Sequence, residues 1–366
     1  MNLKRRSLGK VHAMNKNKSN LQLCMALGLL MFSGFSFAES AITGLHFLHK
    51  DWELACDNTG TCRAAGYQAE DHLARPVSVL LQRAAGAHAP VSARVKIDAA
   101  HIPAQRKPLQ LSMLGRSYGT VALDLRSGEG QLSAAQTKAL LKAVQSAQPV
   151  VWTADDAEWA LSAAGASAVL LKMDDFQKRV GTPSALARKG MQSNAGVLKM
   201  QPLPLVQVKN YQRGIAKRLN VNAAQAQQLA ARLKKSAPKE DCWALYEGSY
   251  LPEDQIAIYP LNRQNVLVEA PCWRAAYNYG YGYWVMDKAL MQTRQFVTAS
   301  ASSFSEGQIF AAQKGRGIAD CGSQDEWAWN GSRFVKTYQA IQAQCKGFTG
   351  GAWDMPLLIS KVQAAQ

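Results

Sequence analysis

The 366-residue sequence predicts a mainly β protein with a few helices, an α+β fold in which two antiparallel β modules are joined by a basic linker and a helix. Three observations support this prediction. Short segments of alternating apolar residues are separated by Gly, Asn and Pro turns, few segments have helical periodicity, and one long internal stretch lacks acidic residues. The expected divisions are a signal peptide over 1–38, an N-terminal β-rich domain with two helices over 39–188, a basic linker and helix over 189–239, and a C-terminal antiparallel β domain over 240–366.

The first 38 residues have the order of a secretory signal. Six Lys or Arg and no acidic residue precede an apolar run over 21–35, and Ser36-Phe37-Ala38 places small residues where a signal peptidase cleaves. The run of about 15 residues is shorter than the roughly 20 that span a bilayer. Either Met1 or Met14 could be the start, because 14–38 is itself a complete signal. We expect cleavage and a periplasmic protein without a transmembrane segment, with a retained membrane anchor as the alternative.

The charge that remains after cleavage favours anionic partners. Removal of residues 1–38 lowers the formal net charge from +16 to +10. In the cell envelope, the anionic partners are peptidoglycan, lipopolysaccharide and acidic lipid head groups rather than nucleic acid. The alternative is that this charge serves solubility alone.

The N-terminal module opens with a predicted hairpin. Trp52, Leu54 and Cys56 share one strand face, the residues 57–60 form a turn, and the chain returns through Cys62. Further strands are expected over 77–82 and 93–97, and a second hairpin joins 109–114 to 120–125. Helices are expected after Ser133, which forms a capping box with Gln136, and over 165–180 before Gly181.

The linker is marked by its charge. No acidic residue occurs over 176–239, and a third helix is expected from Asn222 to Lys235. We name the basic residues of 176–239 the basic belt. It is either a surface for an anionic partner or a solvated linker.

The C-terminal module is rich in aromatic residues. Cys242-Trp243 and Cys272-Trp273 each lie in a strand-like segment, and Asn330-Gly331 between alternating apolar arms predicts a hairpin. Tyrosines alternate with Asn or Gly and are followed by a tryptophan, which predicts a flat aromatic strand face. This candidate binding face consists of Tyr277, Tyr279, Tyr281, Tyr283 and Trp284. The alternative is that these rings pack beneath a neighbouring sheet.

Six cysteines remain once Cys24 leaves with the signal, an even number that indicates disulfides in an oxidising compartment. Proximity and the division into modules pair Cys56 with Cys62, Cys242 with Cys272, and Cys321 with Cys345. Zinc is disfavoured because no Cys-x-x-Cys spacing occurs and the C-terminal module contains no histidine.

Candidate catalytic residues do not assemble into a set. Gly115-Arg116-Ser117-Tyr118-Gly119 matches a nucleophile elbow, but the residues that follow alternate like a strand, where the motif requires a helix. The remaining histidines are interpreted as surface residues, and the pairs Asp155-Asp156 and Asp174-Asp175 as turn and helix-end residues. These histidines are His46, His49, His72, His88 and His101. We therefore assign no catalytic, cofactor or metal residue and lean against an enzyme.

Several motifs resemble domain-of-unknown-function family 1176, a family of exported proteobacterial proteins. They are the segment 51–67, the segment 315–322, Trp327-Ala328-Trp329-Asn330-Gly331 and the segment 350–356. The segment 159–181 also resembles the end of invasion-associated locus B-type domains, which are exported β-rich modules. The resemblance implies location and architecture, and it implies no activity or catalytic residue.

These observations predict an uncharacterised periplasmic protein with a non-enzymatic binding or structural role at the cell envelope. The ligand would be a glycan, lipopolysaccharide or a protein. The alternatives are an envelope hydrolase, and an inhibitor or partner of an envelope enzyme.

Overall fold

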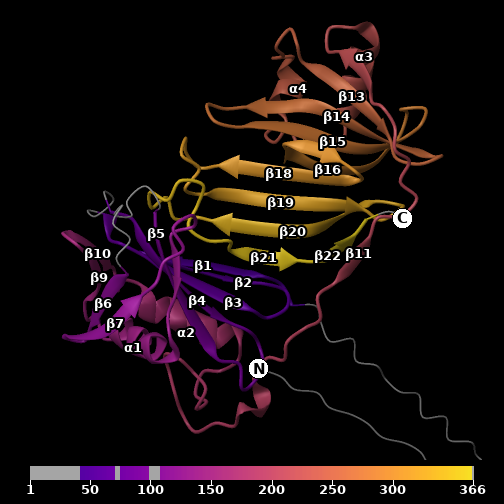
Figure 1. Cartoon of the computed structure of the whole chain (residues 1–366). Helices are drawn as coiled ribbons and strands as arrows, with labels where there is room; N and C mark the ends of the chain where they lie inside the picture. The colour runs from indigo at the N-terminus through magenta and orange to yellow at the C-terminus, as the bar shows by residue number, and fades with distance from the viewer. Residues whose placement is uncertain (1–41, 71–74, 99–107, 365–366) are drawn as a thin grey trace, which may run out of the picture. The chain divides into compact units, whose positions relative to one another are not determined.

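The computed structural model describes residues 42–70, 75–98 and 108–364, and over these residues the chain is mostly β, with five sheets and four α-helices (Figure 1). The mainly β fold with a few helices is therefore confirmed. The predicted signal peptide, residues 1–38, lies outside the described residues. Within the described part of the chain, no helix has the length and apolar character needed to cross a membrane.

The predicted first hairpin belongs to a six-stranded antiparallel sheet, which we name sheet A. Its strand order is β1 (Leu45–His49), β2 (Trp52–Cys56), β3 (Cys62–Tyr67), β4 (Val77–Arg83), β5 (Val91–Ile97) and β8 (Glu129–Gln131). Side chains alternate between its two faces, yet β2 is buried at every position. Both faces of this sheet are therefore covered.

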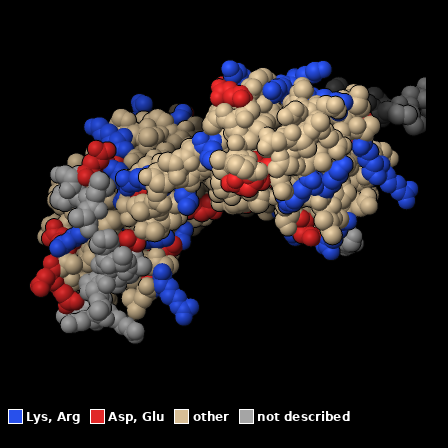
Figure 2. All heavy atoms as spheres, turned by 90° about the horizontal axis from the view of Figure 1, so that it is seen from above, with Lys and Arg blue, Asp and Glu red and all other residues tan. Residues whose placement is uncertain are grey.

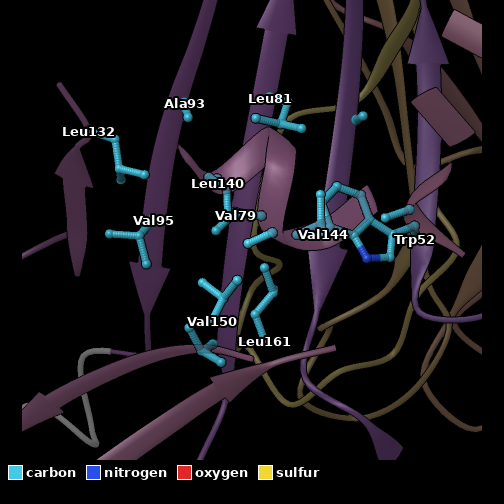
Figure 3. Close-up of a cluster of buried hydrophobic side chains, with 14 of the residues drawn as sticks. Trp52, Val79, Leu81, Ala93, Val95, Leu132, Leu140, Val144, Val150 and Leu161 are labelled. Atoms are coloured by element: carbon cyan, nitrogen blue, oxygen red, sulfur yellow. The ribbon is translucent and has the colours of Figure 1, made fainter. Parts of the chain in front are cut away.

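Helices and a second sheet cover one face of sheet A. Sheet B has the order β10 (Ala157–Leu161), β9 (Val150–Ala154), β6 (Leu109–Met113) and β7 (Arg116–Val121). Helices α1 (Ala134–Gln145) and α2 (Ala166–Phe176) pack into the same core, and the predicted capping box of Ser133 and Gln136 is present. Figure 3 shows this core, where Val79 and Leu81 of β4 lie among Leu140, Val144 and Trp52.

A segment from the far end of the chain covers the other face. Phe348, Ala352, Trp353 and Met355 pack with Tyr67 and other side chains of β2, β3 and β4. Polar contacts fix the same segment, since the Trp353 indole N–H donates to the Ser78 hydroxyl at 2.7 Å. The earliest sheet of the chain is thus completed by residues 348–355.

The predicted linker contains regular structure. It includes a 3-10 turn (Asn194–Gly196), β11 (Leu205–Gln207), β12 (Lys217–Asn220) and helix α3 (Ala224–Leu233), so the third predicted helix is present. Strand β11 pairs in parallel with β22 (Lys361–Gln363), and β12 is the edge strand of the next sheet. Residues 189–239 are therefore not only a flexible connection, because β11 and β12 form backbone hydrogen bonds with other strands.

Two five-stranded antiparallel sheets follow. Sheet D has the order β12, β13 (Gln255–Pro260), β14 (Asn265–Arg274), β15 (Tyr279–Asp287) and β16 (Thr293–Ala301). Sheet E has the order β17 (Ser303–Ser305), β18 (Gln308–Lys314), β19 (Gly322–Trp329), β20 (Phe334–Gln342) and β21 (Pro356–Ile359). Their inner faces share one core that includes Leu267, Val285, Ile309 and Trp329. The predicted Asn-Gly hairpin joins β19 to β20, where the Asn330 side chain accepts hydrogen bonds from the backbone of Ser332 and Arg333.

The prediction of a strand at Cys242-Trp243 is wrong. Cys242 precedes the short helix α4 (Trp243–Glu247), which ends at Gly248 in the left-handed conformation. The sequence Trp-Ala-Leu-Tyr-Glu contains good helix formers, and Gly is the usual residue just past a helix end. Cys242 therefore reaches Cys272 of β14 from a helix rather than from a neighbouring strand.

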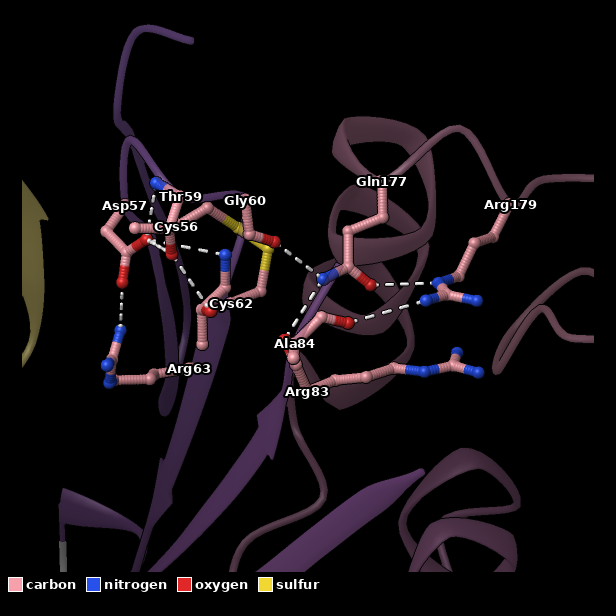
Figure 4. Close-up of a disulfide and its surroundings, with 11 residues drawn as sticks. Cys56, Asp57, Thr59, Gly60, Cys62, Arg63, Arg83, Ala84, Gln177 and Arg179 are labelled. Atoms are coloured by element: carbon pink, nitrogen blue, oxygen red, sulfur yellow. Dashed lines mark hydrogen bonds and ion pairs between the residues drawn. A yellow bond between two sulfur atoms is a disulfide. The ribbon is translucent and has the colours of Figure 1, made fainter. Parts of the chain in front are cut away.

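The structure contains the three disulfides that the sequence predicts, namely Cys56–Cys62, Cys242–Cys272 and Cys321–Cys345. Figure 4 shows the first, which closes the hairpin of β2 and β3. Asp57 accepts from the Thr59 backbone at 2.9 Å and pairs with Arg63 at 2.7 Å, which fixes the turn between the two cysteines. The Gln177 amide donates to the carbonyls of Gly60 and Arg83, so the residues after α2 are tied to this hairpin.

Candidate functional site

The predicted aromatic face divides along its strand. Tyr277 and Tyr279 are 61% and 50% exposed, Tyr281 is half-buried, and Tyr283 is buried in the core between sheets D and E. Trp284 lies on the opposite face of β15, where it packs among residues that α3 and α4 cover. The five residues therefore do not form one surface. Strand β15 runs from solvent into the core, and Trp284, which directly follows Tyr283 on this strand, must point to the other face, so its inclusion in the predicted face is wrong.

Tyr283, at the buried end of the predicted aromatic face, has a structural role. The hydroxyl groups of Tyr283 and Tyr259 both donate to the Glu269 carboxylate. Burial, and then the negative charge of Glu269, raises the pKa of Tyr283 well above its usual value. The same two causes raise the pKa of Tyr259 to about 12. Tyr283 thus satisfies a carboxylate at the edge of the core and has no free face for a ligand.

The exposed end forms a small aromatic patch, which we name the tyrosine surface and define as Tyr277, Tyr279 and Tyr281. The rings of Tyr279 and Tyr281 meet edge to face with centroids 5.4 Å apart. The neighbouring chain is held in place, because the Asn278 side chain donates to the Lys314 carbonyl at 2.7 Å and accepts from the Lys314 N–H at 2.8 Å. Arg274 lies opposite Tyr279 on β14. The Arg274 guanidinium pairs with Asp254 at 2.9 Å, so an ion pair lies beside the exposed rings.

A pocket of about 480 Å³ lies between sheet A, sheet E and the segment that carries Trp353. We name it the Trp353 pocket. Its charged lining residues are Arg94 and Lys96 of β5, Glu129 of β8, and Asp354. Ligand pockets usually have volumes of about 300–1,000 Å³. The size of this pocket therefore suits a small molecule.

The Trp353 ring holds two cations at the pocket. The Arg94 guanidinium lies 5.0 Å and the Lys96 Nζ 5.7 Å from the ring centroid, within the range of cation–π attraction. Arg94 Nη1 lies 2.6 Å from Glu129 Oε2, and Lys96 Nζ lies 3.5 Å from Glu129 Oε1. Two cations thus share one carboxylate.

The walls of the Trp353 pocket are fixed by covalent and polar links. Cys321 lines the pocket and is bonded to Cys345, while the Asp320 carboxylate accepts from the Gly347 N–H at 2.7 Å. The Gly350 N–H donates to the Ile318 carbonyl at 3.0 Å. These links hold the walls of the pocket in place.

Sequence reasoning missed this pocket. Two signals were present: Arg94 and Lys96 alternate on one face of a predicted strand, and Trp353 lies in a motif that carries the family resemblance. Nothing in the sequence shows that the two segments meet, because about 260 residues separate them.

The other candidates do not assemble into a catalytic group among the described residues. Ser117 is exposed on strand β7, and the strand, not a helix, continues to Val121. His46 and His49 lie on strand β1 three positions apart, which places their side chains on opposite faces. His72 and His101 lie outside the described residues. Cys321 and Cys345 lie near Asp320, but their sulfur atoms are joined to each other and cannot act as thiolate ligands.

Of the acidic pair Asp174-Asp175 near the end of α2, Asp174 has a structural role. Asp174 is buried, and its carboxylate accepts from the backbone N–H groups of Leu186 and Ala187 at 2.7 and 2.8 Å. Burial raises the pKa of Asp174, while the two backbone hydrogen bonds oppose that rise. This carboxylate therefore anchors the residues after α2 to the first core.

The basic belt is not one continuous surface. Arg179 is buried and donates to the carbonyl of Gly86 at 2.6 Å, while Arg213 pairs with Glu306 at 2.7 Å. Figure 2 shows Lys and Arg spread over the face in view, with Asp and Glu among them. Some of the positive charges of 176–239 are therefore buried or paired with acidic residues and do not form part of a basic surface.

Comparison with known proteins places the chain among uncharacterised relatives. The family described as "Protein of unknown function (DUF1176)" matches residues 46–360. The chain is 24% identical over 337 residues to the uncharacterized protein YpfG of Escherichia coli (strain K12), an alignment that covers 83% of this chain and 90% of YpfG. No solved structure matches the chain. The likeness of 159–181 to invasion-associated locus B-type domains stays a prediction.

Proposed function

Because the chain belongs to the DUF1176 family, whose description names no activity, we propose a function from its surface: a non-enzymatic binding protein of the cell envelope whose tyrosine surface contacts a glycan. The carrying observation is the exposure of Tyr277 and Tyr279 at 61% and 50%. Tyr279 begins β15 and Tyr277 lies in the turn before it; exposed aromatic rings at such places commonly mark contact sites, since they offer apolar faces and hydroxyl groups together.

The surroundings of the tyrosine surface support a glycan ligand. Tyrosine rings can stack on the apolar faces of sugar rings, while their hydroxyl groups bind sugar hydroxyls. Arg274 lies opposite Tyr279 and pairs with Asp254 at 2.9 Å, so this cation could exchange part of that pairing for the acidic groups of envelope polymers. The backbone at Asn278 is held by two hydrogen bonds, so little ordering is required on binding.

Export supports the same proposal. The signal-like segment 1–38, the three disulfides and the basic charge expected after cleavage together favour the periplasm. We expect protein purified from its native envelope to begin at residue 39 and to contain no free thiol. N-terminal sequencing and non-reducing peptide mapping measure both. Six free thiols, or a purified protein that still carries residues 1–38, would contradict the export proposal.

The tyrosine surface is tested by the double variant Tyr277→Ala/Tyr279→Ala in a sedimentation assay with purified peptidoglycan. We expect affinity to fall about fivefold to a hundredfold, because two aromatic contacts of about 0.5–1.5 kcal/mol each are lost. Thermal stability should stay unchanged, since both side chains are exposed.

Tyr118→Ala, on β7 of sheet B, removes a half-buried tyrosine outside the tyrosine surface and should bind as the unaltered protein does. Equal retention of the double variant and the unaltered protein would reject the tyrosine surface as the contact site. A fall of several degrees in the melting temperature of the double variant would instead favour packing as the role of these rings.

A further inference from the structure

We propose that the Trp353 pocket binds a small anionic ligand that carries a carboxylate or a phosphate group, with Arg94 and Lys96 as its cationic partners. This site is separate from the tyrosine surface and does not depend on it. The proposal rests on three features of the pocket: a fixed pair of cations, a single carboxylate that both cations share, and walls that are held by covalent and polar links.

The two cations are held in place by their position and by the ring beneath them. Arg94 and Lys96 are two positions apart on β5, so both side chains project from the face of sheet A that residues 348–355 cover. The Trp353 ring cannot turn freely, because it is 6% exposed and its indole N–H donates to Ser78. Binding of a ligand would therefore cause little further loss of side-chain conformational entropy at these two cations.

Among the described residues, one carboxylate serves both of these cations, although two acidic residues line the pocket. Glu129 is the carboxylate that both cations approach, at 2.6 Å from Arg94 and 3.5 Å from Lys96. The longer distance exceeds the usual 2.7–2.9 Å of a charge-assisted hydrogen bond, and an ammonium group has three donors. Asp354, the other acidic lining residue, accepts a hydrogen bond from Tyr338. A second anion beside Lys96 would complete the cluster.

Burial makes this second anion favourable. The Lys96 side chain is 19% exposed and that of Glu129 is 26% exposed. Charges interact more strongly in such partly buried places than at an open surface, because water screens them less. An anion that joins Arg94 and Lys96 therefore gains more here than it would at an exposed lysine.

The body of the ligand is expected to be small and polar. The pocket has a volume of about 480 Å³, and Ser323, Gln324 and Gln342 line it beside the cations. These side chains offer both donors and acceptors for hydroxyl groups. The chemistry suits a sugar-sized molecule with one acidic group.

Isothermal titration calorimetry on the purified chain tests the proposal with glucuronate, glucose 6-phosphate and uncharged glucose. We expect saturable binding of at least one of the two anions, at least about tenfold tighter than that of glucose. Glucuronate alone would identify a carboxylate as the ligand group, and glucose 6-phosphate alone would identify a phosphate. Both results support the proposal.

Two variants, one that removes a positive charge and one that removes a negative charge, are expected to change the affinity in opposite directions. Lys96→Met keeps most of the apolar stem and removes the charge, so the affinity for the anion should fall at least about tenfold. Glu129→Gln removes the competing carboxylate and should raise that affinity severalfold. Lys217→Met, on the exposed edge strand β12, is the control and should change nothing.

The proposal is overturned if neither anion binds saturably, if glucose binds as tightly as both anions, or if Glu129→Gln leaves the affinity unchanged. The last variant decides the matter even if Lys96→Met does not fold. Binding of the anion to the variant Tyr277→Ala/Tyr279→Ala should be normal, so failure of the tyrosine surface and failure of this pocket can be told apart.

Discussion

Replacement of Trp353 by alanine is expected to lower the free energy of unfolding by about 3–5 kcal/mol, the usual cost of removing a large buried aromatic side chain. Trp353 packs with Tyr67, Leu80 and Met355, and donates a hydrogen bond to Ser78. Its loss leaves a cavity against sheet A, removes one of the two hydrogen bonds of the Ser78 hydroxyl, which still donates to the Gly66 carbonyl, and removes the ring beneath Arg94. Urea unfolding followed by circular dichroism measures the change.

Two further variants separate the causes. Trp353→Phe keeps most of the apolar volume and loses the bond to Ser78, so a smaller decrease of about 1–3 kcal/mol is expected. Tyr279→Ala, which truncates an exposed aromatic ring, should change the free energy of unfolding by less than about 0.5 kcal/mol. A decrease below about 1 kcal/mol for Trp353→Ala would show that residues 348–355 do not hold sheet A together as the structure indicates.

Alkaline pH is expected to destabilise the protein steeply, because buried tyrosines cannot ionise in the folded state. Burial, and then the charge of Glu53, raises the pKa of Tyr67 well above its usual value, and Tyr283 is raised in the same way by burial and Glu269. Above pH about 10 the unfolded chain loses these protons while the folded chain keeps them. The free energy of unfolding should therefore fall by about 1.4 kcal/mol per pH unit for each residue.

The direction of these pKa shifts determines the pH range in which the two tyrosines affect the free energy of unfolding. The contribution of both hydroxyl groups is fully present below pH about 10 and is lost as the pH rises. Urea unfolding at a series of pH values above about 10 should show a slope of about 2.7 kcal/mol per pH unit from the pair, which Tyr67→Phe and Tyr283→Phe each reduce by about half. Tyr279→Phe removes an exposed hydroxyl and is the matched control. Equal slopes for Tyr283→Phe and the unaltered protein would disprove the assignment.

Local patterns were sufficient to predict much of the fold. The turn at 57–60, the capping box at Ser133 and the Asn-Gly hairpin at Asn330 each depend on a few neighbouring residues, and the structure has all three. The error at Trp243 has a local cause as well. Aromatic residues favour strands, but in Trp-Ala-Leu-Tyr-Glu the helix formers and the following Gly248 decide the conformation.

The candidate sites were predicted less completely, because they depend on contacts that the sequence does not show. The tyrosines alternate as a strand requires, but where β15 enters the core depends on sheet E and cannot be deduced from β15. The Trp353 pocket requires β5 to meet residues 350–355, and neither segment alone indicates a site. Alternation therefore predicts that the tyrosines share a face and excludes Trp284 from it, and it cannot predict which part of that face meets water.

The covering of sheet A by residues 348–355 has a consequence for biogenesis. A ribosome completes the strands of this sheet long before it makes Phe348 and Trp353, and the hydrogen bond from the Gln68 amide to the Lys346 carbonyl spans 278 positions. Until translation ends, Tyr67 and Leu80 have no native cover, and a nascent chain in that condition is prone to aggregate. Native cover for this face therefore depends on the last part of the chain, so we expect a chain truncated before Phe348 to aggregate more readily than the full chain.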